Sequence, residues 1–393
     1  MTTHIGVGFS REPNTTTAAR DASLQAKTNI KTATDLAIVF GTAHYSPLET
    51  LRVVRQTLGD AKVIGCSTAG IIREAIETRG IAVLAIKSND MKFGAGYVSD
   101  LTPSEMRIAG AKLARDAVAD FGQSRRGAFL ILYDGLLKNH SLLLKGIQEV
   151  FGRVFPIIGA GSSDNFRFKE TYQFFQDKPL NHSVVAVLLG GQMTAGFAAY
   201  HGWKPLGKPR QITKADGHII KTIDNKKASL LYEEYLGMSS TELKTEEGIQ
   251  SCYFYPLGTA LEGEKEYLLR HIIGILDDGS LLCQGEISEG AEIHMMITNK
   301  DFLRQAAVDA AYEVKNTLYG REPQCIIIFE SLARQHLLGR EAIEEIRAIR
   351  EILGMNVPVV GMYSYGIINP LKSLNFKGES YLHNGSILIL AVT

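Results

Sequence analysis

The chain lacks the signals by which several classes of protein are recognised from sequence. Its four cysteines, Cys66, Cys252, Cys283 and Cys325, lie far apart and form no Cys-x-x-Cys pair, so neither a structural zinc site nor a disulfide framework is indicated. Lysine plus arginine and aspartate plus glutamate both number 42, so no net charge attracts nucleic acid or an anionic membrane surface. No apolar run approaches the roughly 20 residues that cross a bilayer. We therefore expect a cytoplasmic protein that binds no nucleic acid and does not insert into a membrane.

The chain does have enough apolar sequence for large hydrophobic cores. Of its 393 residues, 45% are hydrophobic and 21% are charged, and this length favours two or more domains. The stretch from Trp203 to Arg210 contains two prolines and three basic residues, which is typical of a surface connection. We therefore predict an N-terminal domain over residues 1–208 and a C-terminal domain over residues 222–393.

Three loops of one kind recur along the chain. Each follows a short β-branched run that stops at a glycine, and small or polar residues come next, as in Val63–Gly70, Ile157–Asp164 and Val359–Gly366. An apolar run and an amphipathic stretch precede each loop, and another apolar run follows it. This order predicts an α/β fold of two domains, with mixed β-sheets, flanking helices and repeated strand–helix–strand–strand units. The alternative is an α/β protein without duplication, because only the glycines are identical in all three copies.

Two further segments carry clear local signals. Thr102 and Pro103, followed by an apolar periodicity that stops at Gly122, predict a helix that Thr102 caps. In the second half, three apolar stretches between Tyr267 and Ile297 are separated by two glycine-containing turns. These stretches predict an antiparallel meander.

The recurring loops are the best candidates for a binding site. Backbone N–H groups, hydroxyls and phenols at strand ends suit a small polar ligand, arginine offers a fork for a carboxylate, and Asp164 could accept from an ammonium group. An amino-acid-like ligand satisfies these groups together. The residues that we expect to contact it are Cys66, Ser67, Thr68, Gly159, Gly161, Ser162, Asp164, Arg270, Arg334, Tyr363, Tyr365, His383 and Asn384.

Each of these residues also has a structural alternative. The glycines could serve only tight strand exits, and Cys66 could be a small apolar residue at a buried strand end. The arginines could form ordinary ion pairs. Only the joint recurrence of the loops favours a shared pocket.

Taken together, these motifs resemble the FIST sensory proteins over nearly the whole chain, in both an N-terminal and a C-terminal region. The segments that carry the resemblance are Gly65–Gly70, Gly159–Asn165, Tyr267–Arg270 followed by Asp277–Gly279, Ser331–Arg334, Gly361–Gly366 and His383–Asn384. The resemblance implies a ligand-sensing module of prokaryotic signal transduction that binds small molecules such as amino acids. It also implies a partner in trans, namely a sensor histidine kinase, a chemoreceptor or a cyclic-di-GMP enzyme. Ile367 and Ser331 depart from the family pattern, in which glutamate and cysteine are frequent.

Two other functions are left open by the sequence. One subgroup of the family is described as haem proteins that sense nitric oxide, and His44, His140, His201 and His383 are candidate axial ligands, although no Cys-x-x-Cys-His motif permits covalent attachment. Gly65–Ala69 nearly spells the Gly-x-Ser-x-Gly elbow of a hydrolase, but its last residue is alanine and no base is marked. We therefore expect no catalysis, no metal site and no cofactor beyond the haem alternative.

Overall fold

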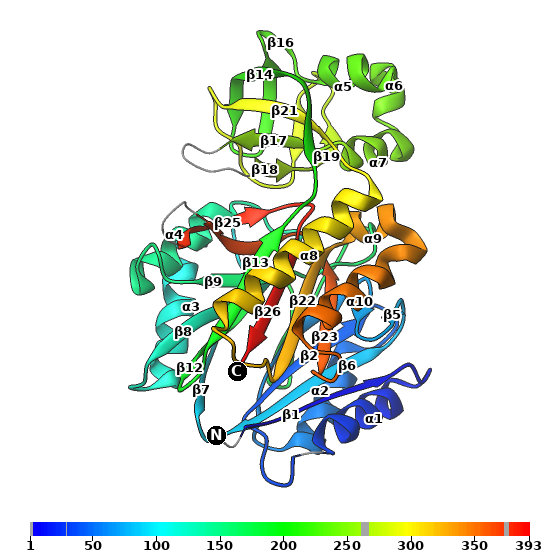
Figure 1. Ribbon diagram of the computed structural model, residues 1–393. Coiled ribbons are helices and arrows are strands. Elements are labelled where there is room, and N and C mark those ends of the chain that lie inside the picture. The colour runs from blue at the N-terminus through cyan, green and yellow to red at the C-terminus, as the bar shows by residue number, and fades with distance from the viewer. Residues whose placement is uncertain (1–2, 29, 261–266, 373–376) are drawn as a thin grey trace.

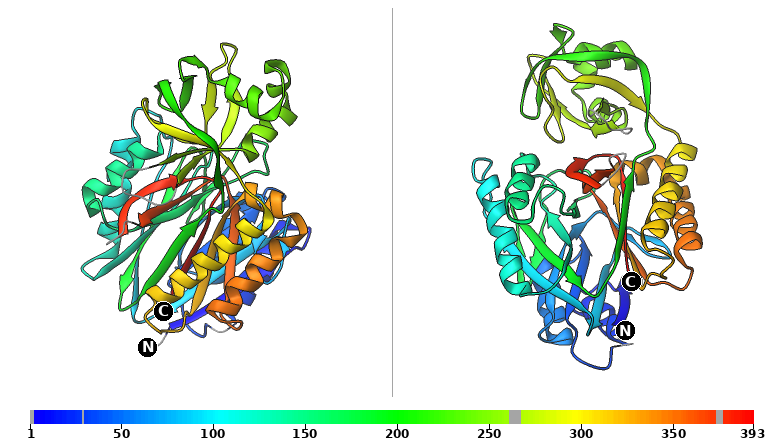
Figure 2. Two further views of the ribbon diagram at one scale, coloured as in Figure 1. Left: turned by 45° about the horizontal axis from the view of Figure 1, so that its top comes forward. Right: turned by 60° about the vertical axis from the view of Figure 1, so that its left-hand side comes forward.

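The computed structural model describes residues 3–28, 30–260, 267–372 and 377–393. In these residues the chain forms three six-stranded mixed sheets and one eight-stranded antiparallel sheet. Figures 1 and 2 show the three mixed sheets with helices on their outer faces and the eight-stranded sheet above them. The predicted α/β class with mixed sheets and flanking helices is confirmed.

The three mixed sheets are built from three repeats of the same element order. The first repeat contains β1 (Thr3–Ser10), α1 (Thr15–Lys27), β2 (Leu36–Thr42), α2 (Pro47–Leu58), β3 (Lys62–Thr68), β4 (Ile71–Ile72), β5 (Ile76–Glu77) and β6 (Ile81–Ser88). The second contains β7 (Met91–Val98), α3 (Met106–Phe121), β8 (Arg126–Tyr133), α4 (His140–Phe151), β9 (Ile157–Gly161), β10 (Gln173–Phe175), β11 (Lys178–Leu180) and β12 (Val184–Gly191).

The third repeat is interrupted after its first strand. It contains β13 (Ala195–Tyr200), then α8 (Lys300–Thr317), β22 (Cys325–Ser331), α9 (Leu332–Leu338), the 3₁₀ turn η1 (Gly339–Glu341), α10 (Ala342–Leu353), β23 (Val359–Ser364), β24 (Ile367–Lys372), β25 (Lys377–His383) and β26 (Ile387–Val392). The interruption, residues 204–297, forms the eight-stranded sheet and is called the insert below. The predicted boundary between residues 208 and 222 falls within this insert.

The insert consists of eight strands and three short helices. These are β14 (Lys204–Asp216), β15 (Ile219–Ile223), β16 (Lys226–Lys227), α5 (Ser229–Leu236), α6 (Ser240–Leu243), α7 (Glu246–Phe254), β17 (Leu257–Ala260), β18 (Tyr267–Arg270), β19 (Ile272–Ile275), β20 (Leu281–Cys283) and β21 (Glu292–Ile297). Strands β19 and β20 pair as predicted, but β21 pairs with β14 and β17. The predicted meander is therefore wrong in its last strand.

The three sheets are interlocked in a ring. Each repeat lends an antiparallel strand pair to another sheet: β4–β5 extends the sheet of the third repeat, β10–β11 that of the first and β24–β25 that of the second. The inner faces of all three sheets share one hydrophobic core, and the helices cover the outer faces. This exchange brings the loops that follow β3, β9 and β23 together.

The glycines that recur in the loops have a packing role. Gly65, Gly159 and Gly361 stand opposite the parallel neighbouring strand, and a Cβ atom at any of them would collide with a carbonyl oxygen of that strand. One residue later, Cys66, Ala160 and Met362 all enter the shared core. These glycines therefore serve close packing inside β3, β9 and β23, which differs from the tight strand exits considered from the sequence.

One predicted helix begins later than expected. Helix α3 starts at Met106, its N-cap is Glu105, and no side chain caps it. Thr102 Oγ1 instead donates to Glu105 Oε2 at 2.6 Å, so the residues from Thr102 onward form a turn. No helix among the described residues is long and apolar enough to span a membrane.

Candidate binding site

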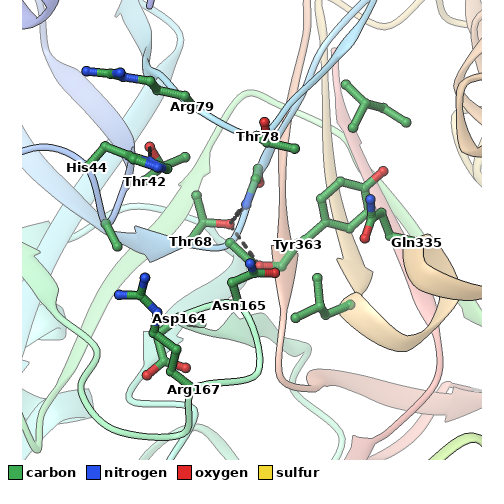
Figure 3. Close-up of a pocket in the computed structure, with 15 residues that line it drawn as sticks. Thr42, His44, Thr68, Thr78, Arg79, Asp164, Asn165, Arg167, Gln335 and Tyr363 are labelled. Carbon is green, nitrogen blue, oxygen red and sulfur yellow. Dashed lines mark hydrogen bonds between the residues drawn. The ribbon is translucent and has the colours of Figure 1, made fainter. Parts of the chain in front are cut away.

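Two adjoining cavities open where β2, β3 and β9 end and the third-repeat strand β23 passes beside them. Their volumes are 460 and 410 Å³, and Thr42, Ala43, Asp164 and Arg167 line both. We call the two together the loop cleft. All three recurring loops line the larger cavity, through residues that include Thr68, Asp164 and Tyr363 (Figure 3). Its volume lies in the range typical of small-molecule sites.

Hydrogen bonds tie the three loops to one another. Ser163 Oγ donates to the Tyr363 carbonyl at 2.5 Å and accepts from the Ala69 N–H at 2.9 Å. Thr68 Oγ1 lies 2.8 Å from the same carbonyl, and the Tyr363 N–H donates to the Gly70 carbonyl at 3.0 Å. The loops therefore form one cross-linked wall, and Thr68 is the predicted hydroxyl that also lines the larger cavity.

The other two predicted serines already have protein partners. Ser67 lines the smaller cavity, and its Oγ accepts from the Tyr172 N–H at 2.9 Å. Ser162 is fully buried, and its Oγ lies 2.8 Å from Thr171 Oγ1 within a polar network. Ser67 thus borders the loop cleft, whereas Ser162 supports it from behind.

Asp164 organises the loop that follows it. One carboxylate oxygen accepts from the Phe168 N–H and from the Tyr365 hydroxyl at 2.9 and 2.5 Å. The other accepts from the N–H groups of Lys169 and Glu170 at 2.8 and 3.1 Å. Both oxygens are therefore occupied, and the expected role of Asp164 as an acceptor for a ligand ammonium group is not supported. Tyr365 serves the same loop, because its ring stacks on Phe168 at 4.7 Å.

Among the described residues, two arginines that the sequence did not single out line the loop cleft, and Lys169 also lines its smaller cavity. Arg79 and Arg167 are both exposed and line the larger cavity. Arg79 lies over the Tyr45 ring at 5.6 Å and reaches the Pro13 carbonyl at 3.4 Å. Arg167 forms no hydrogen bond or ion pair within the described residues. In the view of Figure 3 the arginines lie on one side of the cavity, and Tyr363 and Gln335 lie on the other.

Arg334, predicted to bind the ligand, is a buried structural residue. Its Nε lies 3.2 Å from Glu330, and its Nη2 donates to Glu345 and to the Leu303 carbonyl. Its Nη1 donates to the His201 carbonyl at 2.6 Å. Burial raises the pKa of both glutamates, and Arg334 opposes this shift. The guanidinium has no free donor edge to offer a ligand, which corrects the prediction.

Arg270 is also buried, at the contact between the insert and the second sheet, which we call the seam. Its Nε donates to the Glu286 carbonyl at 2.7 Å, and its Nη1 donates to the carbonyls of Leu269 and Leu382 at 2.8 and 3.2 Å. These bonds join the insert to β25. Arg270 does not line the loop cleft, so its predicted contact there is wrong.

Four other predicted contacts also lie outside the loop cleft. His383 Nε2 donates to the Asn369 carbonyl at 3.0 Å, and Asn384 Nδ2 donates to the Gln284 carbonyl at the seam. Gly159 and Gly161 are buried in β9. For all four, packing or protein hydrogen bonds replace the predicted ligand contact at the cleft.

Cys66 belongs to the apolar core. Its Sγ lies 3.2 Å from Met362 Sδ, and burial raises the pKa of its thiol. A protonated, inaccessible thiol is a poor nucleophile. The small apolar alternative for Cys66 is the correct one.

The described residues offer no support for the haem and hydrolase alternatives. His44 lines the polar loop cleft, whereas burial lowers the pKa of His140 and His383 to about 4 and that of His201 to about 3. Among the residues described, no group of three or more His, Cys, Asp or Glu side chains is placed to hold a metal ion. The hydrogen bond recorded for Ser67 Oγ is to a backbone N–H and not to a base.

Comparison with protein families gives a match along most of the chain. Residues 35–226 match the FIST N domain, and residues 228–370 match the FIST C domain. An uncharacterised protein of Mycobacterium tuberculosis is 25% identical over 386 residues, covering 94% of this chain and 96% of that protein. An uncharacterised protein of Methanocaldococcus jannaschii is 24% identical over 294 residues, covering 66% of this chain and 55% of that protein.

Solved structures give only a distant likeness. The crystal structure of cyanuric acid hydrolase from A. caulinodans aligns over 100% of this chain and 99% of that chain, with 8% identity and a TM-score of 0.40. Phosphoribosylformylglycinamidine synthase II from Thermotoga maritima aligns over 100% and 72%, with 10% identity and a TM-score of 0.23. Scores this low say nothing about the activity of this chain.

Proposed function

Because the chain belongs to the FIST family, whose members are generally sensor and signal-transduction domains, we propose that it senses a small polar molecule that carries a carboxylate. The observation that carries this proposal is the pair Arg79 and Arg167. Both guanidinium groups line the loop cleft, and no carboxylate of the described chain pairs with either. Arginine presents planar paired donors that match a carboxylate.

The remaining lining groups fit a ligand of amino-acid size. Thr42, Thr68 and Thr78 supply hydroxyls to the larger cavity. Glu170 lines the smaller cavity, and its Oε1 accepts from Asn181 Nδ2 at 3.1 Å. Its carboxylate has further acceptor capacity that suits an amino group, the role first expected of Asp164. An amino acid or a similar small acid is therefore the ligand class that we propose.

Helix α9 connects the loop cleft to the insert. Leu332 and Gln335 line the larger cavity. Between them Arg334 bonds the carbonyls of His201 and Leu303, which lie just before and just after the insert. One short helix therefore contacts both the ligand cleft and the two connections to the insert.

The loop that Asp164 organises makes a second contact with the insert. Phe166 meets the Tyr253 ring of α7 edge-on at 5.4 Å. His336, at the end of α9, stacks on Phe254 of the same helix at 5.2 Å. A ligand that binds two positions of these walls with different affinity shifts the population of insert arrangements.

The output in this proposal is a separate signalling protein. A sensor histidine kinase, a chemoreceptor or a cyclic-di-GMP enzyme would read the arrangement of the insert in trans. The family membership supports this role in general terms, and the two contacts between cleft walls and insert supply a physical means.

A thermal-shift panel tests the proposal. Acetate, succinate and pyruvate are each compared with the corresponding methyl ester, which keeps the carbon skeleton and removes the charge. We expect at least one carboxylate, and no ester, to raise the melting temperature in proportion to its occupancy. A panel of amino acids then refines the ligand class. Equal shifts from acid and ester, or none from any acid or amino acid, would overturn the carboxylate assignment.

A further inference from the structure

A group of buried polar atoms at the seam has no hydrogen-bond partner among the described residues. These atoms are Tyr133 Oη, both ring nitrogens of His140, Gln284 Oε1 and Asn384 Oδ1. The four residues are 1%, 2%, 8% and 1% exposed. An unsatisfied buried polar group costs about 1–3 kcal/mol, so a set of them usually indicates a bound molecule or ordered water. None of the four lines the loop cleft.

The four side chains lie together although they come from distant segments. The rings of Tyr133 and His140 are 4.9 Å apart in an edge-to-face arrangement. A Cβ atom at Gly366 would stand 3.2 Å from Asn384 Oδ1 and 3.3 Å from Tyr133 Oη, so both oxygens face this glycine. Gln284 adjoins them, because its side chain bonds the carbonyl of Tyr365. We call this group the seam cluster.

The hydrogen-bonding character of the two amides is fixed by their partners. Gln284 Nε2 donates to the Tyr365 carbonyl, and Asn384 Nδ2 donates to the Gln284 carbonyl at 2.5 Å. A carbonyl can only accept, so neither amide can be turned over without losing its bond. The free atoms Gln284 Oε1 and Asn384 Oδ1 are therefore acceptors that require two donors.

The other two members of the seam cluster can supply donors. Burial lowers the pKa of His140 to about 4, so at neutral pH its ring has one N–H donor and one acceptor nitrogen. The Tyr133 hydroxyl donates or accepts as required. Glu286 raises the pKa of His140 and Arg270 lowers it, but burial has the largest effect and keeps the ring neutral.

A primary carboxamide complements this arrangement. Its two N–H groups match the two amide oxygens, and its carbonyl oxygen matches the donors of Tyr133 and His140. We propose that the seam cluster is a second binding site, separate from the loop cleft, for the amide or urea group of a small neutral molecule. Because Gln284 belongs to the insert and Tyr133 and His140 belong to the second repeat, such a molecule bridges the seam.

Titration with propionamide tests the site, with N,N-dimethylpropionamide as the matched compound that has no N–H group. We expect saturable binding of propionamide, seen by calorimetry and in soaked crystals, and none of the dimethyl analogue. Equal binding of both compounds, no binding of either, or crystals that show only water at the seam cluster would overturn the proposal.

The variant Tyr133→Phe tests the same site. The Tyr133 hydroxyl lies beside the Gly161 N–H, which already donates to the Gly366 carbonyl at 2.9 Å, so we expect the melting temperature to change little and the affinity for propionamide to fall roughly threefold to tenfold. Tyr253→Phe is the control, since Tyr253 is also a buried tyrosine whose hydroxyl has no partner. Equal affinities in the two variants would contradict the site, whatever the result of the carboxylate panel.

Discussion

Two pairs of arginines in this protein differ in burial and in the partners of their guanidinium groups. Arg270 and Arg334 are buried, and their guanidinium groups are engaged by protein carbonyls and carboxylates. Arg79 and Arg167 are exposed in the loop cleft and pair with no carboxylate of the described chain. The comparison teaches that the buried pair joins elements of the fold, whereas the exposed pair is left for a ligand. The predictions below test this division.

The largest expected effect is on the buried ion group. Arg334→Leu leaves Glu330, Glu345 and two backbone carbonyls without their donor, and we expect a loss of about 3–5 kcal/mol in the free energy of unfolding. Urea denaturation measures it. Arg304→Leu is the control, since Arg304 pairs with carboxylates at the surface and its loss should destabilise the fold far less. Equal losses in the two variants would contradict the structural role of Arg334.

Acid is expected to destabilise the protein through its buried histidines. Burial lowers the pKa of His140, His271 and His383 to about 4, while the unfolded chain takes up these protons near pH 6.5. Between these values the unfolded state binds more protons, so the free energy of unfolding falls as the pH falls. In this window each histidine lowers the free energy of unfolding by up to about 1.4 kcal/mol for each pH unit of acidification. Above the window this loss is absent.

Urea denaturation at pH 7, 6 and 5 checks this expectation. His383→Gln should make the free energy of unfolding depend less steeply on pH, by the contribution of one histidine. A midpoint that does not move between pH 7 and pH 5 would show that these histidines do not stay neutral in the fold.

The smallest expected effect on stability is at the exposed pair. Arg79→Gln and Arg167→Gln should each change the free energy of unfolding by less than about 0.5 kcal/mol, because neither residue has a carboxylate partner to lose. Arg52→Gln, at an exposed site on α2, is the matched control. A loss well beyond that of the control would mean that the cleft arginines also hold the fold together.

Local pattern was sufficient to predict much of the fold. The bounds of α2 follow from Pro47, its apolar spacing and Gly59, and the recurring glycines correctly marked equivalent strands. The pairing of β21 with β14 could not be predicted, because it joins strands separated by most of the insert. The interruption of the third repeat after β13 could not be predicted either, because it also depends on strands that pair across a long separation in sequence.

The candidate site shows the same limit. The loops were located from sequence because their signal is local, and Thr68, Asp164 and Tyr363 do meet at one cavity. The choice of arginines failed because the partners of Arg334 include His201 and Leu303, 133 and 31 residues away. Nothing in the sequence distinguished Arg79 or Arg167 from other surface arginines.

The three repeats are alike at some positions and differ at positions only a residue away. At the glycines and in the shared core the copies are alike, since Cys66, Ala160 and Met362 occupy equivalent positions. At the next position they diverge into Ser67, Gly161 and Tyr363. Packing therefore maintains the symmetry of the core, whereas the position that follows carries a different residue in every copy, and only Ser67 and Tyr363 of these three line the loop cleft.

The central claim is that Arg79 and Arg167 hold an anionic ligand, and calorimetric titration tests it most directly. The carboxylate that gives the largest thermal shift is titrated into the native protein, Arg79→Gln, Arg167→Gln and the Arg52→Gln control. A charge-assisted hydrogen bond contributes about 1.5–3 kcal/mol, so each cleft variant should weaken binding about tenfold or more, while the control binds as the native protein does. Unchanged affinity in both cleft variants would contradict the account.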